Sequence, residues 1–257
     1  MTHIRRQIVA ALLAVCLLPF CAHAATTIVI PGTSNIFGAG LSAPPPSPDT
    51  LWNRQHADQS GPGILPAGLT FTPDPYLVLH FDSIGGAGVG FGATSGLSYG
   101  EGFSNQMYGP SLVSTNVSST AGISGIQMTN RVMFLVGVFL GPGLPTTAPA
   151  VADFTGASNQ LDYRPLIGQT FFIGNGFTDS GTKQNFYIPT GASRLYLGFA
   201  DGWLFNGAPS WYADNHGSLT ASLSIDPYVP TPEPAAVWLL GLPVAVMWYR
   251  ARRKRSA

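Results

Sequence analysis

The feature that most constrains this chain is how often glycine and proline interrupt it. The sequence holds 31 glycines and 22 prolines among 257 residues, and neither follows the three-residue period of collagen. Short runs of β-branched and aromatic residues lie between these turn formers, and no amphipathic helix of three turns precedes residue 229. Short strands joined by such turns predict an all-β protein, either a sandwich or a barrel.

Charge is scarce and unevenly placed. Only 9% of the residues are charged, against about 25% in globular proteins generally. Residues 25–230 hold five basic and eleven acidic side chains, a net charge of −6 (5 − 11), whereas both ends are basic. A nucleic-acid partner requires a basic surface, so this composition argues against one. Basic ends around an acidic middle indicate targeting segments.

Residues 1–24 have the pattern of a secretory signal peptide. Two arginines are followed by the 14-residue apolar run Ile8–Cys21 and then by Ala22-His23-Ala24. Small residues at these last positions predict cleavage by signal peptidase between Ala24 and Ala25. The alternative is an uncleaved anchor, but the run is short for crossing a bilayer. Both cysteines lie in this segment, so the mature protein has no disulfide and no thiolate metal site.

The C-terminal segment, residues 229–257, has three parts in a fixed order. Pro232-Glu233-Pro234 precedes the apolar stretch Ala235–Tyr249, which is predicted to be a single transmembrane helix, and the basic tail 250–255 follows. Basic residues remain on the cytoplasmic side of a membrane, so residues 25–228 are expected to face outward. An ordinary tail anchor is the alternative interpretation.

This tail resembles the PEP-CTERM sorting signal. The resemblance implies recognition of Pro232-Glu233-Pro234 by exosortase, a membrane transpeptidase-like protease, followed by removal or exchange of the helix. It also implies a Gram-negative bacterium that makes exopolysaccharide. The protein would then be exported, pass through an inner-membrane intermediate, and reach the cell surface or the extracellular matrix of a biofilm.

Seven short segments between residues 25 and 228 have strand-like patterns. Arg131–Leu140 is almost continuously apolar, which predicts a strand buried on both faces. Ser218–Ile225 alternates apolar with Ser or Thr, which predicts one buried face. Ranges 31–66 and 85–125 are predicted to be loop-rich, including the run Gly85-Gly86-Ala87-Gly88. The predicted strands are Thr26–Ile30, Tyr76–Phe81, Arg131–Leu140, Gln169–Ile173, Gln184–Ile188, Arg194–Ala200 and Ser218–Ile225.

The order of the last strands and loops resembles the PA-IL type of galactose-binding-like bacterial lectin. Its sharpest part is an Asp that ends a strand, followed by a loop and Tyr212-Ala213-Asp214-Asn215-His216-Gly217-Ser218. The resemblance implies a galactose-binding-like β-sandwich, or jelly roll, that binds a sugar through calcium. Its calcium ligands would be Asp201, Asp214, Asn215 and the backbone carbonyl of Trp211. The loop through Gly202–Ser210 is longer than in those lectins.

The chemistry of these residues is consistent with that role. Calcium takes about six to eight oxygen ligands, and two carboxylates with one amide carbonyl supply part of such a shell. Vicinal sugar hydroxyls could complete it, while Trp203, Trp211 or Tyr212 could stack on a pyranose face. Asp201, Asp214 and Asn215 are therefore candidates for both metal and carbohydrate binding. The alternative is a plain turn in which Asp214 and Asn215 bond to the backbone.

Enzymatic signatures are absent from the sequence. It has no His-x-x-x-His metal pair and no Gly-x-Ser-x-Gly elbow. Glu101 is the single glutamate of residues 25–228, and its flanking glycines indicate an exposed turn. We therefore expect a non-enzymatic exported protein that associates with extracellular polysaccharide, with calcium as its candidate cofactor. A structural secreted protein without a ligand is the first alternative, and a glycan hydrolase is the second.

Overall fold

The computed structural model describes residues 25–92 and 96–228. The predicted signal peptide through Ala24, the motif Pro232-Glu233-Pro234, the helix and the basic tail lie outside these residues. Strands dominate the described part, and helical structure is confined to α2 (Leu51–Gln55) and two short 3-10 turns, Ile36–Gly38 and Trp203–Phe205. The prediction of an all-β protein is therefore confirmed for the described residues.

The strands are mostly short, as the spacing of glycine and proline predicts. They are β1 (Thr26–Pro31), β2 (Ala67–Thr70), β3 (Leu77–Gly90), β4 (Phe103–Ser104), β5 (Met107–Tyr108), β6 (Ser111–Leu112), β7 (Thr115–Val117), β8 (Ile126–Met128), β9 (Arg131–Val132), β10 (Val136–Leu140), β11 (Ala152–Asp153), β12 (Asp162–Tyr163), β13 (Thr170–Phe172), β14 (Asn185–Tyr187), β15 (Arg194–Gly198), β16 (Asn206–Gly207) and β17 (His216–Pro227).

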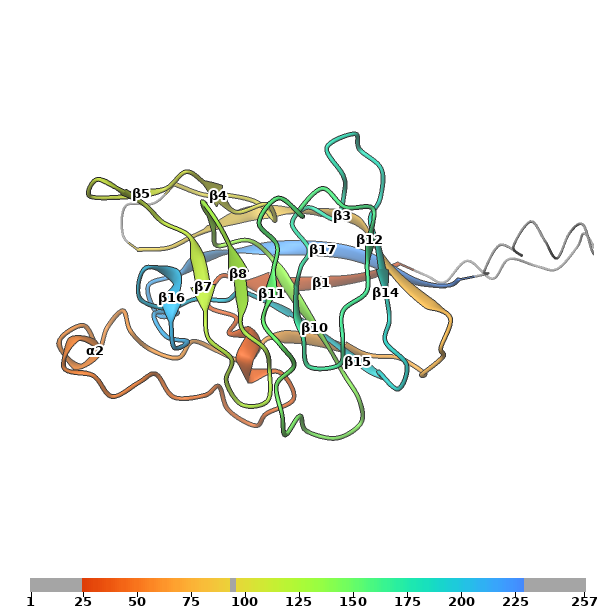
Figure 1. Cartoon of the computed structure of the whole chain (residues 1–257), viewed down its shortest axis with the longest axis horizontal. Coiled ribbons are helices and arrows are strands. Elements are labelled where there is room, and N and C mark those ends of the chain that lie inside the picture. The colour runs from red at the N-terminus through yellow and green to blue at the C-terminus, as the bar shows by residue number, and fades with distance from the viewer. Residues whose placement is uncertain (1–24, 93–95, 229–257) are drawn as a thin grey trace, which may run out of the picture. The chain divides into compact units, whose positions relative to one another are not determined.

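Several sheets form from strands that are distant in the sequence (Figure 1). A five-stranded sheet has the order β1-β17-β3-β14-β12, and a four-stranded sheet has the order β13-β10-β15-β2. A second four-stranded sheet, β11-β8-β7-β16, carries the loops near the candidate site. The first and last long strands pair antiparallel, with Thr26 opposite Leu223 and Pro31 opposite Ser218.

The core lies between the two larger sheets. Leu219, Ala221 and Leu223 of β17 are buried while the intervening residues are more exposed, so the predicted alternation is confirmed. Phe171 of β13 and Phe186 of β14 bring their ring centroids within 5.6 Å of each other, which joins the two sheets. Burying one such side chain stabilises the fold by about 1.5–3 kcal/mol, so this layer of rings is a main source of stability.

The predicted strand Arg131–Leu140 is interrupted in the structure, so that prediction was wrong in its extent. Met133 has φ = 54°, which turns the chain between β9 and β10. The N–H of Leu135 then donates to the carbonyl of Gly100 at 2.8 Å instead of to a neighbouring strand. Within the predicted range, only Val136–Leu140 forms a strand that is buried along its whole length. The continuous apolar run correctly predicted that this segment is buried, but it did not indicate the turn at Met133.

The glycine run at the start of the range predicted to be loop-rich lies inside a strand. β3 continues through it to Gly90. A Cβ on Gly86, which has φ = 108°, would lie 3.1 Å from the carbonyl oxygen of Ser218 and from the amide nitrogen of Thr220 on β17. Glycine therefore allows β3 to bend while its backbone stays close to β17. The rest of the range, through residue 125, consists of loops and very short strands, as predicted.

Candidate functional site

The site begins where β15 ends. The chain after Gly198 remains buried through Phe199 and Asp201, and Tyr212 is also fully buried beside them. The Tyr212 hydroxyl donates to the carbonyl of Phe199 at 3.1 Å and accepts from the N–H of Asp201 at 3.0 Å. Tyr212 thus fixes the end of the strand. Its ring presents no face to solvent, which corrects the expected role in stacking on a sugar.

Asp201 closes the base of the loop that connects it to β17. Its Oδ1 accepts the N–H of Gly202 at 2.7 Å, and its Oδ2 accepts Nδ2 of Asn215 at 2.8 Å. The structure therefore brings Asp201 and Asn215 together, as predicted. Oδ1 of Asn215 is buried and has no hydrogen-bond partner among the described residues. An unpaired buried acceptor is costly, so this atom suits an additional donor or cation.

Burial perturbs both acids of the site. Desolvation raises the pKa of Asp201 well above its usual value, and the neighbouring charge of Asp214 raises it further. Desolvation also raises the pKa of Asp214, to about 6, although its hydrogen bond with a backbone N–H and the charge of His216 act in the opposite direction. Two desolvated carboxyl groups, one of which opposes the ionisation of the other, favour a cation or a proton donor beside them.

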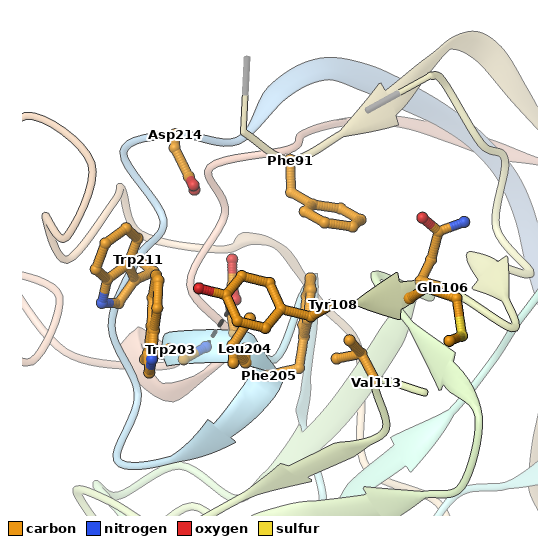
Figure 2. Close-up of a pocket in the computed structure, with 12 residues that line it drawn as sticks. Phe91, Gln106, Tyr108, Val113, Trp203, Leu204, Phe205, Trp211 and Asp214 are labelled. Atoms are coloured by element: carbon orange, nitrogen blue, oxygen red, sulfur yellow. Dashed lines mark hydrogen bonds between the residues drawn. The ribbon is translucent and has the colours of Figure 1, made fainter. Parts of the chain in front are cut away.

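Asp201 and Asp214 line a pocket with a volume of 150 Å³, here called the Trp203 pocket. In Figure 2, the carboxylate of Asp214 points into the space between Phe91, Trp211 and Tyr108. A cavity of this size accepts one six-membered ring. The described residues that line the pocket are mainly apolar: Phe91, Gln106, Met107, Tyr108, Val113, Asp201, Gly202, Trp203, Leu204, Phe205, Trp211 and Asp214.

Trp203 is the centre of an aromatic cluster beside this pocket. Its ring centroid lies 4.3 Å from that of Trp211, 5.2 Å from that of Trp52 and 6.1 Å from that of Tyr108. Trp211 is almost fully buried, whereas Trp203 is partly exposed and Tyr108 is exposed. Trp203 and Tyr108 are therefore the rings that a ligand in the pocket can reach most directly.

The short helix α2 positions Trp211. Thr50 begins this helix because its hydroxyl accepts the N–H of Asn53 at 3.0 Å, which is an N-cap bond. The amide oxygen of Asn53 then accepts Nε1–H of Trp211 at 3.1 Å. The range 31–66, predicted to be a loop-rich surface segment, thus contains the support for one wall of the pocket.

The backbone around the pocket is strained. Leu204, Phe205 and Trp211 all have left-handed φ values, of 52°, 57° and 66°. Such conformations cost non-glycine residues about 1–3 kcal/mol each and are found preferentially at functional sites. The hydrogen bonds of the loop hold them in place: the N–H of Ser210 donates to the carbonyl of Asp201 at 3.1 Å, and the N–H of Tyr212 donates to that of Gly61 at 3.0 Å.

A second depression adjoins the Trp203 pocket. It has a volume of 430 Å³ and shares Tyr108, Val113 and Leu204 with the pocket, so the two are neighbours. We call it the Asn116 groove. Neutral polar side chains contribute to its surface, since its lining residues are Tyr108, Ser111, Leu112, Val113, Ser114, Asn116, Leu204 and Asn206.

Calcium would be held by the carboxylates of Asp201 and Asp214, with Asn215 and the carbonyl of Trp211 as the remaining predicted ligands. The structure supports the acid pair, but Asn215 turns its Nδ2 toward Asp201 rather than its carbonyl oxygen. No group of three His, Cys, Asp or Glu side chains arranged for a metal is found within residues 25–92 and 96–228. The donors in place are fewer than the six to eight oxygens that calcium takes, and the calcium site stays a prediction.

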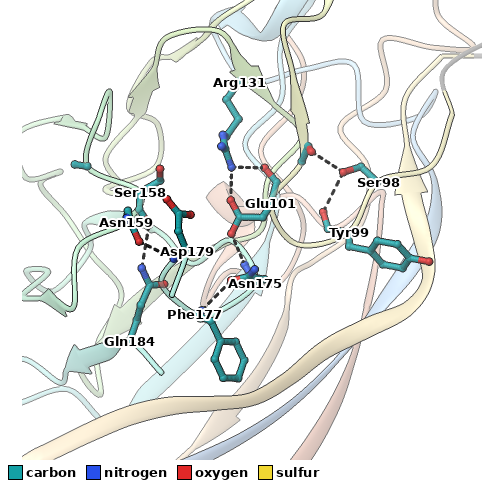
Figure 3. Close-up of polar contacts among 12 residues, drawn as sticks. Ser98, Tyr99, Glu101, Arg131, Ser158, Asn159, Asn175, Phe177, Asp179 and Gln184 are labelled. Carbon is teal, nitrogen blue, oxygen red and sulfur yellow. Dashed lines mark hydrogen bonds and ion pairs between the residues drawn. The ribbon is translucent and has the colours of Figure 1, made fainter. Parts of the chain in front are cut away.

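A different polar cluster surrounds Glu101 (Figure 3). Arg131 forms an ion pair with its carboxylate, and the N–H of Asn175 donates to Oε1 at 2.9 Å. Arg131 also donates to the carbonyl of Glu101 at 3.2 Å. Glu101 lies in a turn, as predicted, but its carboxylate joins three loops instead of pointing freely into solvent. Its bonds assign it a structural role.

Sequence reasoning identified four residues that the structure brings to one pocket: Asp201, Trp203, Trp211 and Asp214. It missed Tyr108, Phe91 and Trp52, which approach from segments about 100 or more residues earlier in the chain. Tyr108 follows an exposed methionine in a glycine-rich stretch, and exposed aromatic residues in such loops are the signal that could have drawn attention to it.

Comparison of the chain with protein-family models, curated proteins and solved structures finds no match. Within the described residues, no helix has the length and apolarity needed to cross a bilayer. The functional argument therefore depends on the geometry of the pocket and on the targeting segments of the sequence.

Proposed function

We propose that the protein is an exported, non-enzymatic β-sandwich that binds extracellular polysaccharide in the Trp203 pocket. One observation carries this proposal: two carboxyl groups and two reachable aromatic rings line a single pocket the size of one six-membered ring. Sugars present apolar C–H faces that pack on aromatic rings and hydroxyls that donate to carboxylates. The pocket combines both kinds of partner.

The proposal includes the lectin-like features implied by the sequence. The galactose-binding-like jelly roll is supported by two mainly antiparallel sheets with the core between them and by the position of Asp201 shortly after β15, next to Asn215. The adjoining Asn116 groove supports a chain of sugars over a single sugar, because it extends the pocket without a barrier of charge.

Export and sorting complete the proposed function. The signal peptide would be removed at Ala25, and exosortase would recognise Pro232-Glu233-Pro234 and release the protein from its membrane intermediate to the surface or matrix. Replacing Glu233 by Ala should leave secretion across the inner membrane intact and accumulate a precursor that retains the tail 250–255. Normal processing of that variant would make the tail a simple anchor.

The binding proposal is tested with the exported protein and a panel of immobilised polysaccharides. Trp203→Ala removes the central ring and should reduce affinity about tenfold or more, since a ring stacked on a ligand contributes about 1–3 kcal/mol. Tyr76→Ala is the matched control, because Tyr76 is an exposed aromatic residue that lies outside the pocket. Absence of binding to the whole panel would favour the structural secreted protein without a ligand.

A glycan hydrolase is the second candidate, and the acid pair is the observation that favours it. Glycosidases use two carboxyl groups, one of which has a raised pKa and donates a proton. Asp201 has a raised pKa, but both its oxygens already accept hydrogen bonds inside the protein. Release of reducing ends from a bound polysaccharide, abolished by Asp214→Asn, would establish hydrolysis in place of simple binding.

A further inference from the structure

The charge of the two adjoining depressions limits the ligands they can accept. Among the described residues that line the Trp203 pocket and the Asn116 groove, the acidic side chains are Asp201 and Asp214, and no Lys, Arg or His is present; His216, whose charge acts on Asp214, lies outside the lining. A uronic acid or a sulfated sugar would bring a like charge to these carboxylates, which is unfavourable. The pocket therefore discriminates against acidic polysaccharides and leaves neutral and cationic ones.

Aromatic rings and carboxylates together form a recognisable kind of surface. The faces of Trp and Tyr rings attract organic cations, and carboxylates accept charge-assisted hydrogen bonds from ammonium groups. Trp203, Trp211 and Tyr108 line the same pocket as Asp214, whose carboxylate points into the space between two of these rings and Phe91 (Figure 2). An ammonium group in this space would contact both kinds of partner at once.

We propose that the Trp203 pocket selects an ammonium group, namely that of a de-N-acetylated hexosamine in a polysaccharide chain. This inference rests on the proposed function and names its substrate class. The ring of the amino sugar would pack on Trp203, and its ammonium would be held by Asp214. An N-acetyl group at the same position has no positive charge and carries extra volume, so it would lose both the charge pairing and the fit.

The Asn116 groove supplies the place for the next sugar. It adjoins the pocket at Tyr108, Val113 and Leu204, and its side chains include two serines and two asparagines. Hydroxyl and amide groups donate to and accept from neutral sugar hydroxyls. The pocket thus recognises the ammonium group, whereas the groove binds the rest of the polysaccharide through hydrogen bonds between uncharged groups.

The test is calorimetric titration of the exported protein with glucosamine oligomers and with N-acetylglucosamine oligomers of the same length, at neutral pH. We expect the free amine to bind at least tenfold more tightly, and Asp214→Asn to remove most of this preference. Asp179→Asn is the charge-matched control, because Asp179 lies in a different loop and does not line either depression. It should leave the preference unchanged.

Two further measurements keep the inference open to refutation. Trp203→Phe retains a ring and should weaken binding less than Trp203→Ala, and the melting temperature of each variant shows whether it folds. Choline is titrated in parallel, since its quaternary ammonium has the same charge but cannot donate a hydrogen bond.

The outcomes are distinguishable. Equal affinity for the amine and the N-acetylated oligomers would overturn the ammonium inference and leave polysaccharide binding standing. Tight binding of choline without binding of either oligomer would overturn the amino sugar as the source of the ammonium. Failure to bind any of these compounds while a neutral polysaccharide still binds would overturn the ammonium inference alone. Failure to bind any polysaccharide would overturn the proposed function with it.

Discussion

The loop at Glu101 and the loop at Asp201 both use acidic side chains, but they balance the charge in opposite ways. Glu101 has Arg131 beside it and an N–H from Asn175. Asp201 is buried and Asp214, like Glu101, is half-buried, and neither aspartate forms an ion pair within residues 25–92 and 96–228. The charge of Glu101 is balanced inside the protein, so this side chain serves to hold neighbouring segments together. Acidic groups that face a pocket without a cation are available to a ligand.

The largest expected effect on stability comes from replacing Tyr212, which supports the loop that carries Asp201 and Asp214. Tyr212→Phe deletes the hydroxyl that bridges Phe199 and Asp201 and leaves the buried N–H of Asp201 unpaired, whereas the carbonyl of Phe199 keeps the N–H of Ile36 as a donor. This should lower the free energy of unfolding by about 2–3 kcal/mol. Urea denaturation measures it, and Tyr76→Phe is the control, because Tyr76 is an exposed tyrosine outside the pocket. A change below 1 kcal/mol would show that water replaces the hydroxyl.

Replacing Glu101, whose charge is balanced by Arg131, should lower the stability of the protein by a smaller amount. Glu101→Ala leaves Arg131 without its carboxylate and the N–H of Asn175 without its acceptor, which should cost about 2 kcal/mol. Asp49→Ala breaks the exposed pair with Arg54 and should cost no more than about 0.5 kcal/mol. The same loss of stability in both variants would contradict the structural role given to Glu101. Polysaccharide binding should be unchanged in both.

Removing the charge of Asp214 from the pocket should increase the stability of the protein near neutral pH. Folding raises the pKa of Asp214 from 3.8 to about 6, so the folded state holds its proton more tightly than the unfolded state. The stability from this group is complete below pH 3.8 and is lost as the pH rises through about 6. Asp214→Asn should therefore be more stable than the wild type at pH 7.5, by about 1 kcal/mol after screening by solvent.

The check is the difference in melting temperature between wild type and Asp214→Asn from pH 4 to pH 8. The difference should grow with pH and level off above pH 7, since Asp214 is then ionised. Asp179→Asn again serves as the control, because Asp179 lies in another loop and does not line the pocket. A difference that is constant across this range would mean that the carboxyl of Asp214 is solvated in the native protein.

Calcium tests the predicted metal site and has the smallest effect that the structure supports. A cation that bound between Asp201 and Asp214 would raise stability by about 2.7 kcal/mol at 100 times its dissociation constant, but by only about 0.4 kcal/mol at a concentration equal to that constant. An incomplete set of ligands binds weakly, so the lower value is expected. The measurement is the melting temperature with calcium and with chelator, in wild type and Asp214→Asn. An identical melting temperature of the wild type with calcium and with chelator would rule out the calcium site. Binding of an amino sugar would then remain as the proposed role of Asp201 and Asp214.

Local patterns predicted the parts of this molecule that are locally determined. The alternation in β17 and the position of Asp201 after β15 could be read from neighbouring residues. The turn at Met133 could not, because its cause is a long-range hydrogen bond between Leu135 and Gly100. The same holds for the pocket: Asp214 and Trp211 belong to one motif, whereas Tyr108 reaches them only through tertiary folding.

The bond between Asp201 and Asn215 has a consequence for how binding preference could change. It closes residues 202–214 at their base, next to the β10–β15 pair, which lies outside this loop. Doubling the length of a closed flexible loop costs only about 0.6 kcal/mol. The loop could therefore be lengthened beside Trp203 and Leu204, which are only partly buried, provided that Phe205 stays in the core and Asn206–Gly207 stays paired with β7. Variation at these two positions could change what the pocket binds while the rest of the fold stays constant.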